Sequence, residues 1–171
     1  MTPRNVTSPR MNRRLLLALA GATSLIGLGL SRRPSRAEGE TFEITKTPEE
    51  WKKILSPESY AVLREEDTER PFTSELLKEH RKGTFNCAGC DLPLFASETK
   101  FDSGTGWPSF YDHLPNAIGK KEDNSLFMSR TEVHCARCGG HQGHVFDDGP
   151  QPTGLRYCIN GVALKFAPLE A

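Results

Sequence analysis

The sequence predicts a mainly β fold with a few short helices near its N-terminus. Its 171 residues include 15 glycines and 12 prolines, and beyond residue 84 the apolar residues come in short runs. Glycine and proline interrupt regular structure, and short apolar runs between them are typical of strands. The length suggests one domain, or two at most, and residues 38–171 are enough for one modest core.

Residues 1–37 are predicted to be an export signal. They hold seven arginines and no acidic residue, and the pair Arg13-Arg14 precedes the apolar stretch 15–30, as in a twin-arginine signal. A helix of this stretch would span about 24 Å, less than the roughly 30 Å of a bilayer core. We expect export to a periplasm or its equivalent. The alternatives are a transit peptide to an organelle lumen and an uncleaved membrane anchor.

The N-terminal segment 1–37 and the remainder of the chain differ in net charge. Residues 38–171 carry 15 basic and 22 acidic groups, without a basic stripe. This argues against nucleic-acid binding. We expect the mature protein to be a monomer that does not span a membrane.

Helix-start signals cluster after residue 46. Residues 38–50 are expected to be a linker and a helix start, because Thr47, Pro48, Glu49 and Glu50 combine a cap, an N-terminal proline and acidic residues. Residues 56–59 repeat the signal, residues 73–77 predict a third short helix, and Gly83 is expected to end this helical part.

Short strands are predicted at residues 93–95, 125–128, 131–134 and 144–146. The clearest strand covers residues 155–160. Period-two alternation turns Leu155, Tyr157 and Ile159 toward a core and places Arg156, Cys158 and Asn160 on the other face. The apolar phase changes after Gly161, which predicts a β-bulge there.

Four of the five cysteines form two C-x-x-C pairs, Cys87 with Cys90 and Cys135 with Cys138. Two such pairs predict a structural zinc site with four thiolates and no open coordination position. The alternative is two disulfides, because an exported protein can meet an oxidising compartment.

Cys158 remains outside these pairs. Composition alone favours a buried, inert thiol. However, Arg156 shares its predicted face and is expected to lower its pKa. His141 and His144 lie close by in sequence, and a thiol beside imidazoles is typical of covalent catalysis.

A second dense segment, residues 101–110, contains two glycines before Trp107 and Pro108. Such a loop can present the indole as an apolar wall for a small group. The alternative is that Trp107 belongs to the core.

Residues 107–110, 141–146, 148–150 and 156–160, framed by the C-x-x-C pairs, resemble the methionine-R-sulfoxide reductase B family. The likeness runs from Trp51 to Phe166, and we expect the domain to cover residues 51–167. It implies two antiparallel sheets with short N-terminal helices, and reduction of the R epimer of methionine sulfoxide in proteins.

The resemblance also implies residue roles. Cys158 would be the nucleophile and pass through a reversible sulfenic acid. Trp107 and Phe146 would bind the substrate. The sulfoxide oxygen or a proton-bearing water would be oriented by His141, His144, Asp148, Arg156 and Asn160.

The chain departs from the family pattern at a few positions. Many relatives carry a resolving cysteine where this chain has Thr105, so we expect a thioredoxin-like protein or another external thiol to reduce Cys158 directly. Gly161 and Ala163 replace two serines and are expected to loosen the surroundings of Asn160. Gln142 replaces an apolar residue and is expected to be neutral.

Two rival functions remain open from the residues. One is a zinc-ribbon-like binding module in which Cys158 is a buried residue without a catalytic role. The other is a different thiol chemistry, such as peroxide scavenging.

Overall fold

The computed structural model describes residues 40–124 and 129–170. Its α-helices are α1 (Pro48–Ile54) and α2 (Pro57–Glu65), and short 3-10 turns are η1 (Glu75–Lys78), η2 (Ser97–Thr99) and η4 (Gly161–Ala163). The strands are β1 (Gly83–Cys87), β2 (Pro93–Ala96), β3 (Lys100–Phe101), β4 (Ser109–Phe110), β5 (Ile118–Asp123), β6 (Arg130–Cys135), β7 (His141–Phe146), β8 (Arg156–Ile159) and β9 (Leu164–Pro168).

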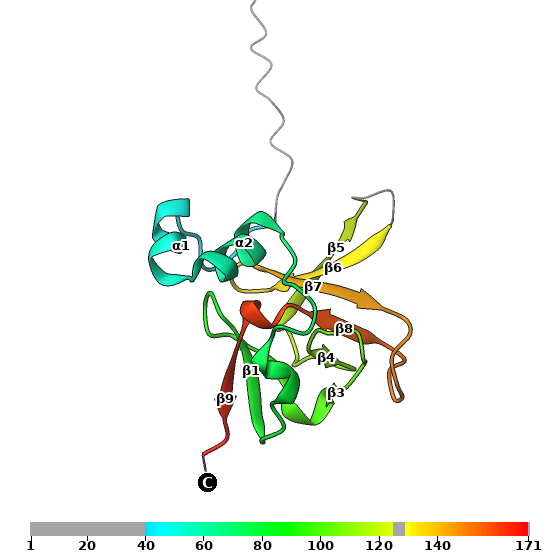
Figure 1. Cartoon of the computed structure of the whole chain (residues 1–171). Coiled ribbons are helices and arrows are strands. Elements are labelled where there is room, and N and C mark those ends of the chain that lie inside the picture. The colour runs from blue at the N-terminus through cyan, green and yellow to red at the C-terminus, as the bar shows by residue number, and fades with distance from the viewer. Residues whose placement is uncertain (1–39, 125–128, 171) are drawn as a thin grey trace, which may run out of the picture. The chain divides into compact units, whose positions relative to one another are not determined.

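The strands form two antiparallel sheets (Figure 1). The smaller sheet has the order β2-β1-β9, and the larger has the order β3-β4-β8-β7-β6-β5. The predicted mainly β fold with two antiparallel sheets and short N-terminal helices is therefore confirmed. β8 lies inside the larger sheet, so side chains on its outer face have neighbours on both flanking strands.

Local sequence explains where the helices begin. Thr47 caps α1 through a capping box with Glu50, and Ser56 caps α2 by accepting a hydrogen bond from the Ser59 N–H. The predicted third helix exists as the single 3-10 turn η1. α1 and α2 bury Trp51, Val62 and Leu63 in the core.

Aromatic side chains from both sheets fill the core between them. The rings of Phe95 and Phe110 stack at 4.4 Å, and Phe85 meets Phe110 edge-on at 5.0 Å. Tyr157 of β8 joins this cluster through Phe95 at 5.9 Å. Packing on this inner face fixes which side of β8 points outward, and thereby where Cys158 lies.

The bulge expected at Gly161 is wrong. β8 ends at Ile159, the turn η4 follows, and β9 then joins the other sheet. The change of apolar phase marks a crossing between sheets, where the chain turns to face the same core from the opposite side. The strand predicted at residues 125–128 and the export signal at residues 1–37 lie outside the described residues. None of the helices in the described part of the chain combines the length and apolar composition of a membrane span.

Candidate active site and metal centre

Cys158 lies at the centre of the larger sheet. On β8 it stands opposite Ser109 of β4 on one side and His144 of β7 on the other. Residues directly opposite in antiparallel strands have Cβ atoms about 4.5–5.5 Å apart on the same face. The register therefore brings the free thiol and an imidazole together.

A small cavity of about 120 Å³ opens onto Cys158. It is lined by Thr68, Trp107, Arg130, Gly143, His144, Phe146, Cys158 and Asn160. Five of these residues were candidate site residues from the sequence. Thr68 and Arg130 carried no sequence signal. Gly143 is required by packing, because a Cβ there would collide with the main-chain oxygen of Cys158.

Glu69 orients two walls of this cavity. Its main-chain oxygen accepts a hydrogen bond from the Trp107 indole N–H at 2.9 Å, and its N–H donates to Asn160 Oδ1 at 2.9 Å. Its carboxylate accepts from the Gly161 N–H at 2.6 Å. Burial raises the pKa of Glu69, although these hydrogen bonds act in the opposite direction. No local motif pointed to this residue, because its partners are 38 and 91 positions away.

His144 has a fixed orientation. Its Nε2 lies 2.8 Å from Asp123 Oδ2, and Asp123 also accepts a hydrogen bond from Arg130 at 2.6 Å. A carboxylate only accepts, so His144 Nε2 carries the hydrogen and Nδ1 is the basic nitrogen. Burial lowers the pKa of His144, and the hydrogen bond to Asp123 only partly opposes this effect. The ring is therefore neutral at neutral pH.

Cys158 is held as a thiol in the resting structure. Burial raises its pKa, and this effect outweighs the lowering by the Thr105 hydroxyl, 3.8 Å from the sulfur, and by the Arg156 charge. The expected net lowering by Arg156 is wrong. The guanidinium acts in the expected direction, but desolvation of the thiolate is the larger effect.

His141 does not line the cavity. It is buried, its Nδ1 donates to Glu132 Oε1 at 2.9 Å, and its ring centre lies 5.4 Å from that of His144. Burial alone would raise the pKa of Glu132, but His141 and Lys121 together lower it. His141 Nε2 has no hydrogen-bond partner among the described residues.

Arg156 and Asp148 also lie beside the cavity and not in its lining. The Arg156 guanidinium binds both carboxylate oxygens of Asp148 at 2.8 Å, and its centre lies 4.4 Å from the centre of the Phe146 ring. This bidentate pair lowers the pKa of Asp148. The two residues therefore influence the cavity in two ways: Arg156 packs on the Phe146 ring, and its positive charge lowers the pKa of Cys158.

Asn160 is firmly held. Its N–H and its side-chain amide both donate to the main-chain oxygen of Gln142, at 2.8 and 3.0 Å. Glu69 and Gln142 bind both ends of the Asn160 side chain, and the loosening expected from Gly161 and Ala163 stays a prediction. A side chain at position 161 would collide with Ser74.

Gln142 has contacts that the sequence did not indicate. It is fully buried, and its Nε2 donates to Gly140 O at 3.2 Å and lies 3.6 Å from Cys87 Sγ. The carbonyl partner fixes the orientation of the amide. One residue therefore contacts both the cysteine cluster and Asn160.

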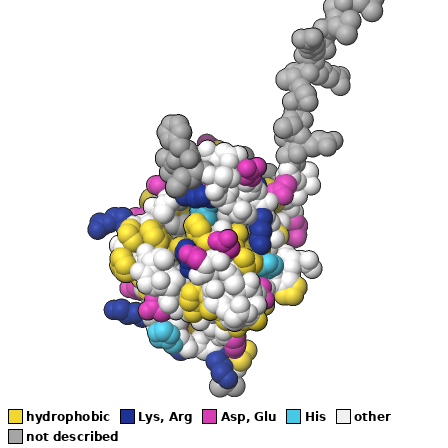
Figure 2. Space-filling model, turned by 90° about the vertical axis from the view of Figure 1, so that its right-hand side faces the viewer, with side chains coloured by type: hydrophobic (Ala, Val, Ile, Leu, Met, Phe, Trp, Pro, Cys, Tyr) yellow, Lys and Arg dark blue, Asp and Glu magenta, His cyan; other side chains and the backbone are white. Residues whose placement is uncertain are grey.

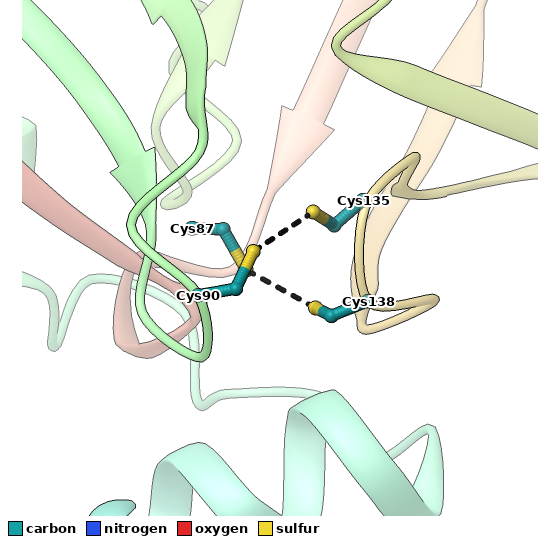
Figure 3. A group of neighbouring side chains, drawn as sticks. All are labelled: Cys87, Cys90, Cys135 and Cys138. Carbon is teal, nitrogen blue, oxygen red and sulfur yellow. Dashed lines mark hydrogen bonds between the residues drawn. The ribbon is translucent and has the colours of Figure 1, made fainter. Parts of the chain in front are cut away.

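The four paired cysteines converge from the ends of β1 and β6 and from the turns that follow these strands (Figure 3). Their sulfur atoms all lie within 4.8 Å of one another, with Cys87–Cys138 at 3.7 Å and Cys90–Cys135 at 3.5 Å. A disulfide requires about 2.05 Å. A tetrahedral ion with bonds of about 2.3 Å would separate sulfurs by roughly 3.8 Å. The cluster therefore fits a structural metal site.

Without a cation, the four thiols of the cluster do not ionise equally: the pKa values of Cys87 and Cys135 are raised, whereas those of Cys90 and Cys138 are lowered. Hydrogen bonds among the sulfurs, with Cys135 contributing most, and burial raise the pKa of Cys87. Hydrogen bonding with Cys135 lowers the pKa of Cys90 to about 7. A bound cation would supply the positive charge that several neighbouring thiolates need.

Sequence comparison agrees with this arrangement. Residues 55–168 match the SelR domain family. A peptide methionine sulfoxide reductase MsrB from Methanosarcina barkeri is 58% identical over 74% of this chain and 90% of its own length. The chain belongs to the MsrB family. MsrB proteins from Pseudomonas putida (58% identical, covering 75% of this chain and 97% of the relative) and Leptospira interrogans (54%, 73% and 96%) are similar over the same extent.

The MsrB match includes the whole site. Residues 55–168 contain the four clustered cysteines, Cys158 and every residue that lines the cavity.

On the face drawn in Figure 2, acidic and basic side chains are interspersed among apolar ones.

Proposed function

We propose that this chain is a peptide-methionine (R)-S-oxide reductase with Cys158 as its nucleophile. The observation that carries the proposal is a free thiol in a cavity of about 120 Å³ between two aromatic rings and a neutral histidine. By the volume of liquid water, about 30 Å³ per molecule, such a space suits a group of a few heavy atoms. A methyl sulfoxide is of this size, and Trp107 and Phe146 offer its methyl group an apolar surface.

The first step needs one proton to move. The Cys158 sulfur bonds to the sulfoxide sulfur, the sulfoxide oxygen takes up a proton and transfers to Cys158 to give the sulfenic acid, and the transient S–S bond breaks as methionine leaves. Cysteine is oxidised by two electrons and the sulfoxide is reduced by two. The proton that the oxygen takes up comes from the Cys158 thiol, so no other acid is consumed.

His144 is the residue that would relay this proton. It faces Cys158 across the strand pair, and its basic Nδ1 can accept from the thiol and donate to the oxygen. Asn160 has one amide hydrogen left after its bond to Gln142, and this hydrogen can orient the sulfoxide oxygen. His141, Asp148 and Arg156 would act through His144 and Phe146.

Cys158 is regenerated by an external thiol under this proposal. Thr105 lies beside the nucleophile, and the other four cysteines are grouped in the cluster. A reductant thiol would attack the sulfenic acid, release water and form a mixed disulfide. A second thiol of a thioredoxin-like protein or small dithiol would then free Cys158.

The metal would be zinc, held by Cys87, Cys90, Cys135 and Cys138. Four thiolates in a closed tetrahedral set are typical of structural zinc, which would tie β1 to the end of β6. We further propose that residues 1–37 direct export, that residues 38–50 link them to the catalytic domain 51–167, and that this domain acts as a monomer.

Separated epimers test the reaction. The wild-type protein is expected to reduce the R sulfoxide of a methionine-containing peptide with a dithiol, and Cys158→Ser is expected to be inactive. Consumption of the S epimer, or activity in Cys158→Ser, would refute the assignment. Turnover of hydrogen peroxide in place of the sulfoxide would favour peroxide scavenging.

A further inference from the structure

A larger groove adjoins the catalytic cavity. It has a volume of about 450 Å³ and lies along α2, with Pro57, Ala61 and Val162 among its apolar lining residues. Thr68 lines both the groove and the cavity. The two hollows therefore lie on either side of this residue or beside it.

Connectivity dictates that part of a polypeptide substrate lies beside the cavity. An extended chain advances by at most about 3.3–3.6 Å per residue. The residues one and two positions from a bound methionine sulfoxide must therefore contact surfaces within roughly 7 Å of the cavity mouth. The groove shares the lining residue Thr68 with the cavity, and its apolar lining suits side chains that lose water on binding.

The charges around the groove select among such side chains. Glu58, Asp67 and Glu69 line it with only one basic residue, Arg70, among the lining residues. Three carboxylates against one guanidinium give a negative potential. An acidic side chain would be repelled, whereas apolar and basic ones would be accepted.

We propose that this groove is a subsite for the residues that flank methionine sulfoxide in a protein substrate, with preference for apolar and basic side chains over acidic ones. The inference rests on the proposed function. It adds a basis for choosing among oxidised methionines by their sequence context.

The test compares a blocked methionine (R)-sulfoxide, acetylated and amidated, with peptides carrying Leu, Lys or Asp beside the sulfoxide. In the wild-type protein, kcat/KM for Leu- and Lys-flanked peptides is expected to exceed that for Asp-flanked peptides by about tenfold. Ala61→Leu, a substitution compatible with a helix, fills the groove. It is expected to remove the advantage of the Leu-flanked peptide over the blocked amino acid.

Charge reversal has a matched control within α2. Glu58 and Glu65 are both exposed, but only Glu58 lines the groove. Glu58→Lys is expected to weaken the discrimination against Asp-flanked peptides, and Glu65→Lys to leave it unchanged. Equal effects of the two variants, or no flank preference in the wild type, would overturn the subsite. Failure of the wild type on the blocked amino acid as well would instead reject the proposed function.

Discussion

The main-chain oxygen of Glu69 accepts the indole hydrogen of Trp107 at 2.9 Å, although the two residues are 38 positions apart. The Glu69 carboxylate in turn holds the Gly161 N–H, next to Asn160. One residue of the loop after α2 therefore sets the positions of two cavity walls.

Glu69→Ala is expected to lower kcat/KM by roughly 10- to 100-fold, because small displacements at a reacting centre are costly. Glu69→Gln keeps an oxygen acceptor and is expected to retain most of the activity. Both variants keep the main-chain oxygen that binds Trp107, so tryptophan fluorescence should change little and the loss of activity would report on the carboxylate at Gly161. Unchanged activity in Glu69→Ala would contradict the positioning role of the carboxylate.

His144→Asn is expected to lower kcat by about 10²- to 10⁴-fold, since it removes the proposed proton relay. KM should change much less, because Asn can still line the cavity. Asp123→Asn should show a smaller loss, because it weakens the hydrogen bonds that orient the ring and Arg130 but keeps the imidazole. A variant His144→Asn with full kcat would exclude the relay.

Thr105→Cys is expected to create an internal disulfide. The Thr105 hydroxyl lies 3.8 Å from Cys158 Sγ, so a thiol there would be in reach of the sulfenic acid. After one turnover without reductant, mass spectrometry should find a sulfenic acid on the wild type and, in the variant, a disulfide that joins the new thiol to Cys158. Thr105→Ser serves as the control and should keep the sulfenic acid.

The pH dependence of alkylation follows from the raised pKa of Cys158. Because the pKa is raised in the folded state, folding favours the protonated thiol. The contribution of Cys158 to the free energy of unfolding is therefore fully present below the ordinary pKa and is lost as pH rises through the folded pKa. The rate of iodoacetamide modification should keep rising about tenfold per pH unit past roughly pH 8.5, the ordinary cysteine value. Arg156→Met should raise the apparent pKa further. A modification rate that stops rising below about pH 8 would contradict the raised pKa of Cys158.

Metal removal is expected to destabilise the fold strongly. Structural zinc contributes about 10 kcal/mol or more to folding in small domains. Cys135→Ser, or a strong chelator, should lower Tm sharply in a thermal melt, whereas Cys158→Ser should leave Tm nearly unchanged. Elemental analysis of the purified protein should give one zinc per chain, and a value near zero in a stable protein would reject the ion.

Local patterns were sufficient to predict several features. The spacing of the C-x-x-C pairs predicted the four-cysteine cluster, and the alternation in residues 155–160 predicted the inward faces of Tyr157 and Ile159. Helix caps predicted α1 and α2 because their signals lie within four residues.

Tertiary contacts determined the rest. Asp123 meets His144 across 21 positions, and Glu69 meets Asn160 across 91, so no short motif contains either pair. The pKa of Cys158 also depended on burial, which alternation along a single strand cannot measure. The change of apolar phase at Gly161 was visible, but its cause was the passage of the chain from one sheet to the other.

Burial ranks the clustered cysteines by their access to oxidants. Cys87, Cys135 and Cys138 are buried, whereas Cys90 is partly exposed. An oxidant arriving from solvent meets Cys90 first. Oxidation of Cys90 would disturb the cluster, in which Cys87 contacts Gln142, and Gln142 in turn binds Asn160 of the cavity. The same stress that oxidises methionines can therefore also disable their repair.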